Sequence, residues 1–181
     1  MNTNDSAWTA PVAVDDIPDT GLHIEIAAPA EARAGIAKVA GLRDVPRLSA
    51  VFDLSKQGAR IRVSGQVSAT VGQTCVVTLE PIENKIEEIV DLIFAPLPAG
   101  AAAEPVMGSR RKGRDEPPEP LIGSAIDLGA VATEFLILGI DPYPRKAGAQ
   151  FAPPEPDDRG PGAFAALEAL RKRSGTQKRE G

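Results

Sequence analysis

The chain has 181 residues, a formal net charge of −5, one cysteine and one histidine. The length suits a single domain with tails, and 17 glycines and 17 prolines place much of the chain in turns and linkers. A lone cysteine excludes an intramolecular disulfide, and with one histidine it cannot supply the ligands of a structural zinc site. The first ten residues lack the basic start and apolar run of a signal peptide, and no apolar stretch is long enough to cross a bilayer. We therefore expect a cytoplasmic protein.

The first elements along the chain are predicted to be a strand and a short helix. Residues 11–27 contain strand by this prediction, because Leu22, Ile24 and Ile26 alternate with polar residues at the period of a half-buried strand. Residues 29–40 are predicted to form a helix, because a proline opens the segment, apolar side chains recur on one face and a glycine follows it.

A β-hairpin is the clearest pattern in the sequence. Apolar residues alternate with polar ones over 48–54 and again over 61–71, and residues 56–58 supply a turn that ends in glycine. Gly65, inside the second strand, predicts a bulge or a sharp bend. Residues 73–79 are rich in β-branched side chains and predict a further strand.

Residues 82–94 are compatible with two structures, an apolar helical stripe and a strand interrupted by Glu88. We favour the strand, because β-branched residues dominate and the segment follows other antiparallel candidates. Its acidic residues would then lie along a solvated strand edge that discourages edge-to-edge pairing, and they are Glu83, Glu87, Glu88 and Asp91. The adjacent Glu87 and Glu88 would point to opposite faces, so they would not form a catalytic carboxylate pair.

The rest of the chain is predicted to hold a linker, a helix and a tail. Residues 96–120 mix proline, glycine, alanine and charges without periodicity, which is typical of a flexible linker. A helix is predicted over 127–139, with Asp127 as its N-cap and a broad apolar face that must dock on the sheet. Residues 146–181 are predicted to be a flexible tail with a short amphipathic helix over 163–173, which could dock on its own domain or on a partner.

These elements predict the α+β class. Residues 1–10 form a flexible N-terminus in this prediction, and residues 11–145 form a single domain. Residues 11–95 are predicted to form an antiparallel, twisted sheet that could curl like a barrel. Helices near 30–40 and 127–139 would cover it, because burying the apolar stripes of both helices on one sheet gives a single core.

Few residues in the sequence can support catalysis. His23 lies on the polar face of its strand, and no nucleophile motif accompanies it, so we expect a solvated side chain. Cys75 has neutral neighbours that offer no charge to stabilise a thiolate, which predicts a buried core cysteine. The basic run at 110–114 is flanked by acids and is expected to be solvated charge. The sequence therefore predicts no enzymatic activity, no cofactor and no bound metal.

Three segments, in the same order, resemble the YceD family of large ribosomal RNA subunit accumulation proteins of bacteria and plastids. Residues 63–81 are similar to the family's strand pair and Cys-x-x-Cys-Leu-Glu-Pro segment, residues 126–145 to its helix and proline-rich turn, and residues 164–170 to its closing Phe-x-x-Leu-x-x-Leu. Thr78 stands where many members carry the second cysteine, so a metal or redox role of that pair cannot operate with Cys75 alone.

The resemblance implies a non-enzymatic factor in bacterial ribosome biogenesis that promotes accumulation and processing of large-subunit ribosomal RNA. Its partner would be that RNA or a pre-ribosomal particle, contacted directly or through a protein, with no membrane and no small-molecule substrate. The alternative is a protein–protein adaptor that recruits a basic partner or a nuclease without touching RNA. A metal-dependent nuclease that uses Glu87 and Asp91 is the weakest hypothesis.

The resemblance also marks candidate site residues. Those that carry the motifs are Gln73, Cys75, Glu80, Glu134, Asp141, Tyr143 and Arg145. The candidates for a partner-docking tail are Phe164, Leu167, Leu170, Arg171 and Lys172.

Overall fold

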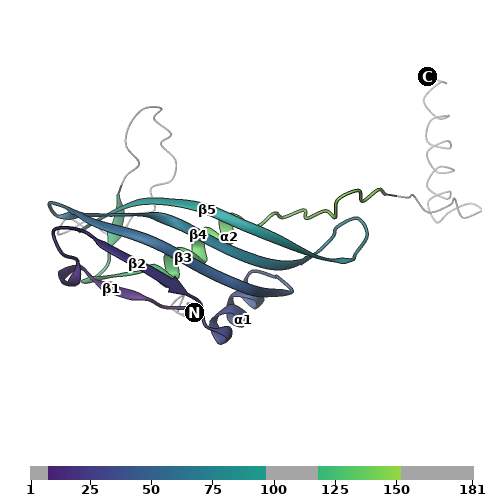
Figure 1. Ribbon diagram of the computed structural model, residues 1–181, viewed down its shortest axis with the longest axis horizontal. Coiled ribbons are helices and arrows are strands. Elements are labelled where there is room, and N and C mark those ends of the chain that lie inside the picture. Colours follow the sequence, from purple (N-terminus) through teal and green to yellow (C-terminus); the bar gives the residue numbers. More distant parts are fainter. Residues whose placement is uncertain (1–7, 97–117, 152–181) are drawn as a thin grey trace, which may run out of the picture. The chain divides into compact units, whose positions relative to one another are not determined.

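The computed structural model describes residues 8–96 and 118–151, and the predicted α+β class is confirmed. In chain order, its elements are β1 (Pro11–Ala13), the 3-10 turn η1 (Val14–Asp16), β2 (Leu22–Ala27), α1 (Ala30–Val39), β3 (Asp44–Gln57), β4 (Arg60–Thr74), β5 (Pro81–Pro96), β6 (Glu119–Leu121), β7 (Ala125–Asp127) and α2 (Leu128–Leu138). Five strands form one sheet in the order β2-β3-β4-β5-β6, and β1 pairs with β7 in a second, two-stranded sheet (Figure 1).

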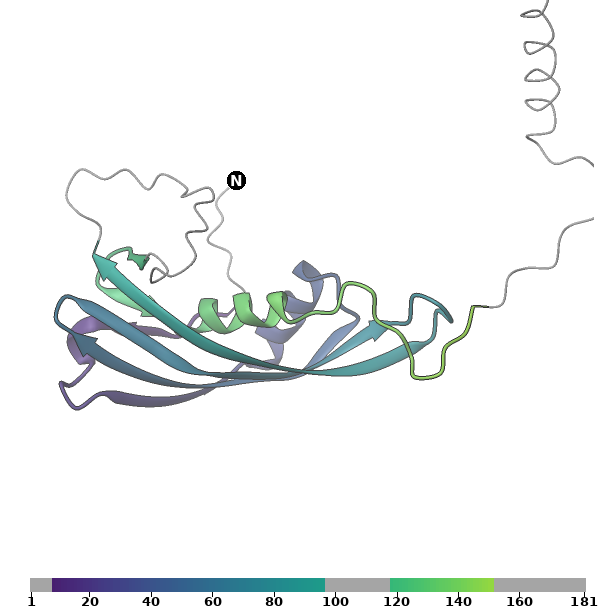
Figure 2. The same cartoon turned by 90° about the horizontal axis from the view of Figure 1, so that it is seen from above.

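The larger sheet is antiparallel except at β5 and β6, which pair parallel. It is curved, and α2 lies on its concave face (Figure 2), while α1 packs beside β3. Among the described strands, β2 and β6 are the two outer ones. The predicted barrel-like closure is therefore wrong, because the two outer strands of the sheet do not pair with each other.

Alternation along β3, β4 and β5 gives the sheet one buried face. Phe52, Val63, Val67 and Val90 are each at most 1% exposed, and Leu136 of α2 is fully buried in the same cluster. Each such large apolar side chain contributes roughly 1.5–3 kcal/mol when fully buried. The other face of the sheet carries mainly polar and charged side chains and is not covered by any described helix.

The predicted hairpin is confirmed, but Gly65 does not form a bulge. It pairs with Phe52 in a continuous register, and the register shifts instead between Asp44 and Arg47. A Cβ at Gly65 would overlap the carbonyl oxygen of Val51 and lie 3.0 Å from the Cα of Phe52. Glycine is therefore required here by the close approach of β3 and β4.

The strand predicted for residues 73–79 is wrong beyond Thr74, where β4 ends and a turn begins. The strand favoured for 82–94 is confirmed as β5. Residues 119–120, predicted as linker, belong to β6, and residues 97–117 lie outside the described residues. The short strands β6 and β7 were not predicted, because three residues carry too little pattern to identify a strand.

The predicted helix 127–139 is confirmed as α2, and its N-cap is Asp127. Oδ1 of Asp127 accepts hydrogen bonds from the N–H groups of Gly129 (3.0 Å), Ala130 (3.2 Å) and Ala10 (2.8 Å). Trp8 is only 6% exposed. The last residues of the predicted flexible terminus 1–10 are thus held against the start of α2, while residues 1–7 lie outside the described residues.

Candidate functional site

The candidate site begins at the turn between β4 and β5, residues 75–80, which we call the cysteine turn. Two backbone hydrogen bonds close this turn. The N–H of Cys75 donates to the carbonyl oxygen of Glu80 (2.9 Å), and the N–H of Leu79 donates to the carbonyl oxygen of Cys75 (3.0 Å). Leu79 has a φ of 60°, in the left-handed region that residues with a Cβ seldom adopt. The N–H of Thr78 donates to Sγ of Cys75 at 3.4 Å, so the fully buried thiol faces the backbone of its own turn.

The segment after α2, residues 141–146, closes over the cysteine turn, and we call it the clasp segment. It runs along the end of the β4–β5 hairpin (Figure 2). The N–H of Val76 donates to the carbonyl oxygen of Pro144 at 2.9 Å, and the N–H of Lys146 donates to Sγ of Cys75 at 3.3 Å. Prolines keep this segment out of a helix, which leaves its backbone groups available for these contacts.

Gln73 joins the clasp segment to the sheet. It is 7% exposed, and its Nε2 donates to the carbonyl oxygen of Asp141 at 2.9 Å while its Oε1 accepts from Nδ2 of Asn84 at 2.7 Å. Asp141 in turn accepts from the N–H of Tyr143 at 2.8 Å through its Oδ1. A buried amide with both ends bonded fixes the position of the clasp segment.

The same contacts set the ionisation of two groups. Hydrogen bonds lower the pKa of the Cys75 thiol to about 6. The largest contribution comes from the backbone N–H of Lys146, and the hydroxyl and N–H of Thr78 contribute less. Nζ of Lys146 lies 3.0 Å from Oε2 of Glu80, and this hydrogen bond is the largest cause of the lowered pKa of that carboxyl. These N–H and O–H donors favour the ionised form of the sulfur. The Cys75 side chain has no exposed area, and its sulfur accepts hydrogen bonds from the backbone of Thr78 and Lys146.

Most of the predicted motif residues meet at this site. Gln73, Cys75, Glu80 and Asp141 lie in or beside the contact, and Tyr143 and Arg145 are exposed on the clasp segment. Glu134 lies apart, on the exposed side of α2. A role of these residues in function stays a prediction. The candidate docking residues of the tail, Phe164, Leu167, Leu170, Arg171 and Lys172, lie outside the described residues.

Two contributors to the site were not found from the sequence. Lys146, assigned to the flexible tail, bonds both the thiol and Glu80, and Asn84 orients Gln73. Cys75 is buried as predicted, but not within a strand. Its sulfur is stabilised by backbone N–H groups, a source that the neutral neighbours in the sequence did not suggest.

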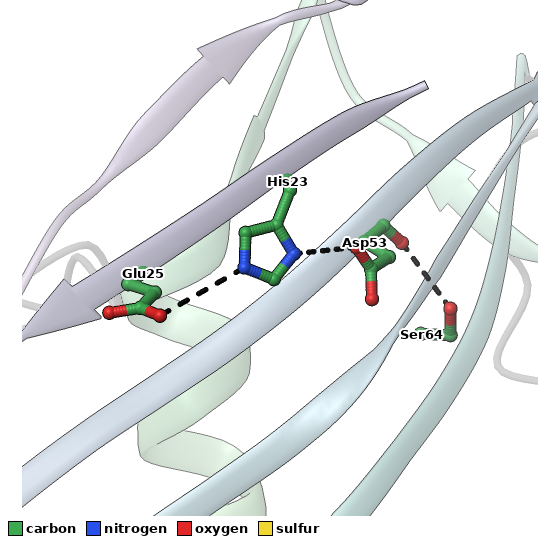
Figure 3. A network of polar contacts seen from close by, with 4 residues as sticks. All are labelled: His23, Glu25, Asp53 and Ser64. Atoms are coloured by element: carbon green, nitrogen blue, oxygen red, sulfur yellow. Dashed lines mark hydrogen bonds and ion pairs between the residues drawn. The ribbon is translucent and has the colours of Figure 1, made fainter. Parts of the chain in front are cut away.

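A second polar cluster surrounds the only histidine on the open face of the sheet (Figure 3). Nδ1 of His23 lies 2.7 Å from Oδ1 of Asp53, and Nε2 lies 3.9 Å from Oε1 of Glu25. The hydrogen bond with Asp53 is the largest cause of the raised pKa of His23. The hydroxyl of Ser64 donates to the carbonyl oxygen of Asp53 at 3.4 Å and not to the imidazole, so these residues do not form a catalytic triad.

A groove of about 870 Å³ lies beside α2, between this helix, the end of β5 and the β6–β7 segment. Phe94, Phe135 and Leu138 give it apolar walls, and the carboxylates of Glu119 and Glu134 also line it. Within residues 8–96 and 118–151, no group of three histidine, cysteine, aspartate or glutamate side chains could hold a metal ion. No described helix is long and apolar enough to span a membrane.

The family described as large ribosomal RNA subunit accumulation protein YceD matches residues 63–171, more than half of the chain. The chain belongs to the YceD family. In this YceD protein the match begins within β4 and takes in the cysteine turn, β5, α2 and the clasp segment. No curated protein and no solved structure matches the chain. The YceD description links the family to accumulation of the large ribosomal RNA.

Proposed function

We propose that this protein is a non-enzymatic factor of ribosome biogenesis that promotes accumulation and processing of large-subunit ribosomal RNA in the bacterial cytoplasm. The observation that carries the proposal is the family match over residues 63–171. Its partner is that RNA or a pre-ribosomal particle that contains it.

Two features of the structure support a role without catalysis. His23, whose two ring nitrogens face Asp53 and Glu25, contacts no serine or cysteine among the described residues. The thiol of Cys75 is fully buried under the clasp segment, so it is out of reach of a substrate. Nucleophilic catalysis through a covalent intermediate would need an accessible nucleophile next to a general base.

A second candidate function is an adaptor that recruits a basic partner or a nuclease without touching RNA. It is favoured by the charge of the described residues, among which acidic side chains outnumber basic ones. Such a surface repels phosphates and attracts cationic protein segments. The two candidates differ in whether the purified protein binds large-subunit RNA directly with the salt dependence of phosphate contacts.

The test of the proposal is the ratio of large to small ribosomal RNA, with ribosomal subunit profiles, in cells that lack the protein. We expect a selective fall of large-subunit RNA that the wild-type chain restores and an empty plasmid does not. An unchanged ratio would overturn the proposal. Purified protein incubated with precursor RNA and Mg²⁺ should leave the RNA intact, and cleavage that disappears with Glu87→Gln or Asp91→Asn would overturn the non-enzymatic part.

A further inference from the structure

One side of β5 is open along most of its length. β5 runs from Pro81 to Pro96 and pairs with β4 from Pro81 to Phe94, whereas on its other side, among the described residues, only Phe94–Pro96 pairs, with β6. Among the described residues, no strand pairs with 81–93 on that side. Figure 1 shows β5 at the margin of the sheet. Such an edge presents unpaired backbone N–H and C=O groups that can receive another strand.

The open edge is acidic. Glu83, Glu87 and Asp91 point to the uncovered face of the sheet, where Lys85 is the one cation of residues 81–93, and Glu88 points to the opposite face. Of these carboxylates, only Asp91 has an ion-pair partner within the described residues, the guanidinium of Arg62 at 2.8 Å. Two copies of this edge would repel each other, whereas a strand that carries lysine or arginine would be attracted.

The groove continues this edge with apolar surface. It follows the last residues of β5 and is closed on the other side by α2. Ile122 and Leu138, both lining residues, are 78% and 71% exposed, and Glu119 and Glu134 add carboxylates. Arg62 also lines the groove, and its guanidinium is paired with Asp91. Apolar walls with acidic neighbours fit a segment that combines apolar side chains with cations.

We propose that the open edge of β5 and the adjoining groove bind an extended, basic segment of a protein partner. The segment adds as a strand beside residues 81–93, places alternate apolar side chains in the groove and sets lysine or arginine beside the carboxylates. RNA is disfavoured at this surface because the same carboxylates repel phosphates. The inference rests on the second candidate function, because it names the kind of protein segment that such an adaptor would bind.

The test uses the full-length protein and a fluorescent synthetic peptide in which lysine and valine alternate. We expect binding that weakens with salt, together with slower amide exchange at alternate residues of 81–93. A peptide of the same sequence, N-methylated along one edge, should bind at least about tenfold more weakly because it cannot pair its backbone. Equal binding of the two peptides, or tighter binding of single-stranded RNA at this edge, would overturn the inference.

Charge-reversal variants give an independent test. The double variant Glu87→Lys/Glu134→Lys should lose about tenfold or more in peptide affinity. The matched control Asp19→Lys/Glu25→Lys makes the same change of net charge away from the edge and should retain most of the binding. Equal losses would show that only net charge matters and would contradict the proposal. Because peptide binding is measured in vitro, its failure is distinct from an unchanged ribosomal RNA ratio in cells.

Discussion

Gln73 and Asp141 lie 68 positions apart in the sequence, and the side-chain Nε2 of the first donates to the carbonyl oxygen of the second at 2.9 Å. This bond connects the end of β4 to the segment that follows α2. Because Gln73 is buried and Asn84 occupies its other polar atom, water cannot readily replace either partner.

Replacing Gln73 with leucine should destabilise the protein by about 1–3 kcal/mol, since the change leaves Asn84 and the carbonyl of Asp141 without their partner. The measurement is urea unfolding followed by circular dichroism. Gln66→Leu, on the exposed face of the same strand, is the matched control and should change stability by about 0.5 kcal/mol or less. Equal effects of the two substitutions would contradict the role assigned to Gln73.

Stability should depend on pH through Cys75. Its folded-state pKa of about 6 lies below the value of about 8.5 expected in the unfolded chain. The thiolate therefore contributes stability that is fully present above the unfolded value and is lost as the pH falls through about 6. The free-energy difference between wild type and Cys75→Ser, measured by urea unfolding in reducing buffer, should grow as the pH rises across this interval. A difference that stays constant with pH would rule out the ionised thiol.

The close approach of β3 and β4 predicts a large effect at Gly65. Gly65→Ala should destabilise the fold by about 1–3 kcal/mol, because the new methyl group meets the backbone of Val51 and Phe52, which cannot rotate away. Ser68→Ala, on the open face of the same strand, is expected to stay within about 0.5 kcal/mol. The comparison is made by thermal unfolding of the two variants. An unchanged stability of the Gly65→Ala protein would mean that β3 and β4 can move apart at little energetic cost.

His23 should titrate above its usual range, and Asp53 should be the main reason. Asp53→Asn is expected to move the pKa of His23 back towards 6.5, whereas Glu25→Gln should move it less, since Glu25 lies farther from the ring. Nuclear magnetic resonance of the imidazole protons across the pH range measures both shifts. Because the folded-state pKa is raised, the pair stabilises the protein below the unfolded pKa and loses this effect as the pH rises through the folded one.

Local patterns were sufficient to predict much of the fold. The alternation along β3 and β4 and the N-cap at Asp127 depend on neighbours in the sequence, and each is present in the structure. The run after Thr74 misled the prediction because its β-branched residues favour a strand. The segment forms a turn instead because it bonds to residues distant in the sequence: the N–H of Val76 donates to the carbonyl oxygen of Pro144.

The candidate site was harder to predict than the fold. The resemblance marked Glu80 and Cys75 as motif residues, but no spacing rule joins either to Lys146, which lies 66 and 71 positions away. Their contact depends on where α2 ends over the sheet. Gly139 allows that approach, since a Cβ there would come within 2.6 Å of Ile86.

The contact between the beginning and the end of the domain affects how the chain folds during its synthesis. Ala10 bonds to Asp127, 117 positions later, and among the described strands β1 pairs only with β7. A nascent chain must therefore keep its first strand unpaired until nearly the whole domain has been translated, which makes completion of the fold a late event. Until then β1 and the apolar face that α2 will cover are open to chaperones and proteases, and a chain that stops before β7 cannot bury them.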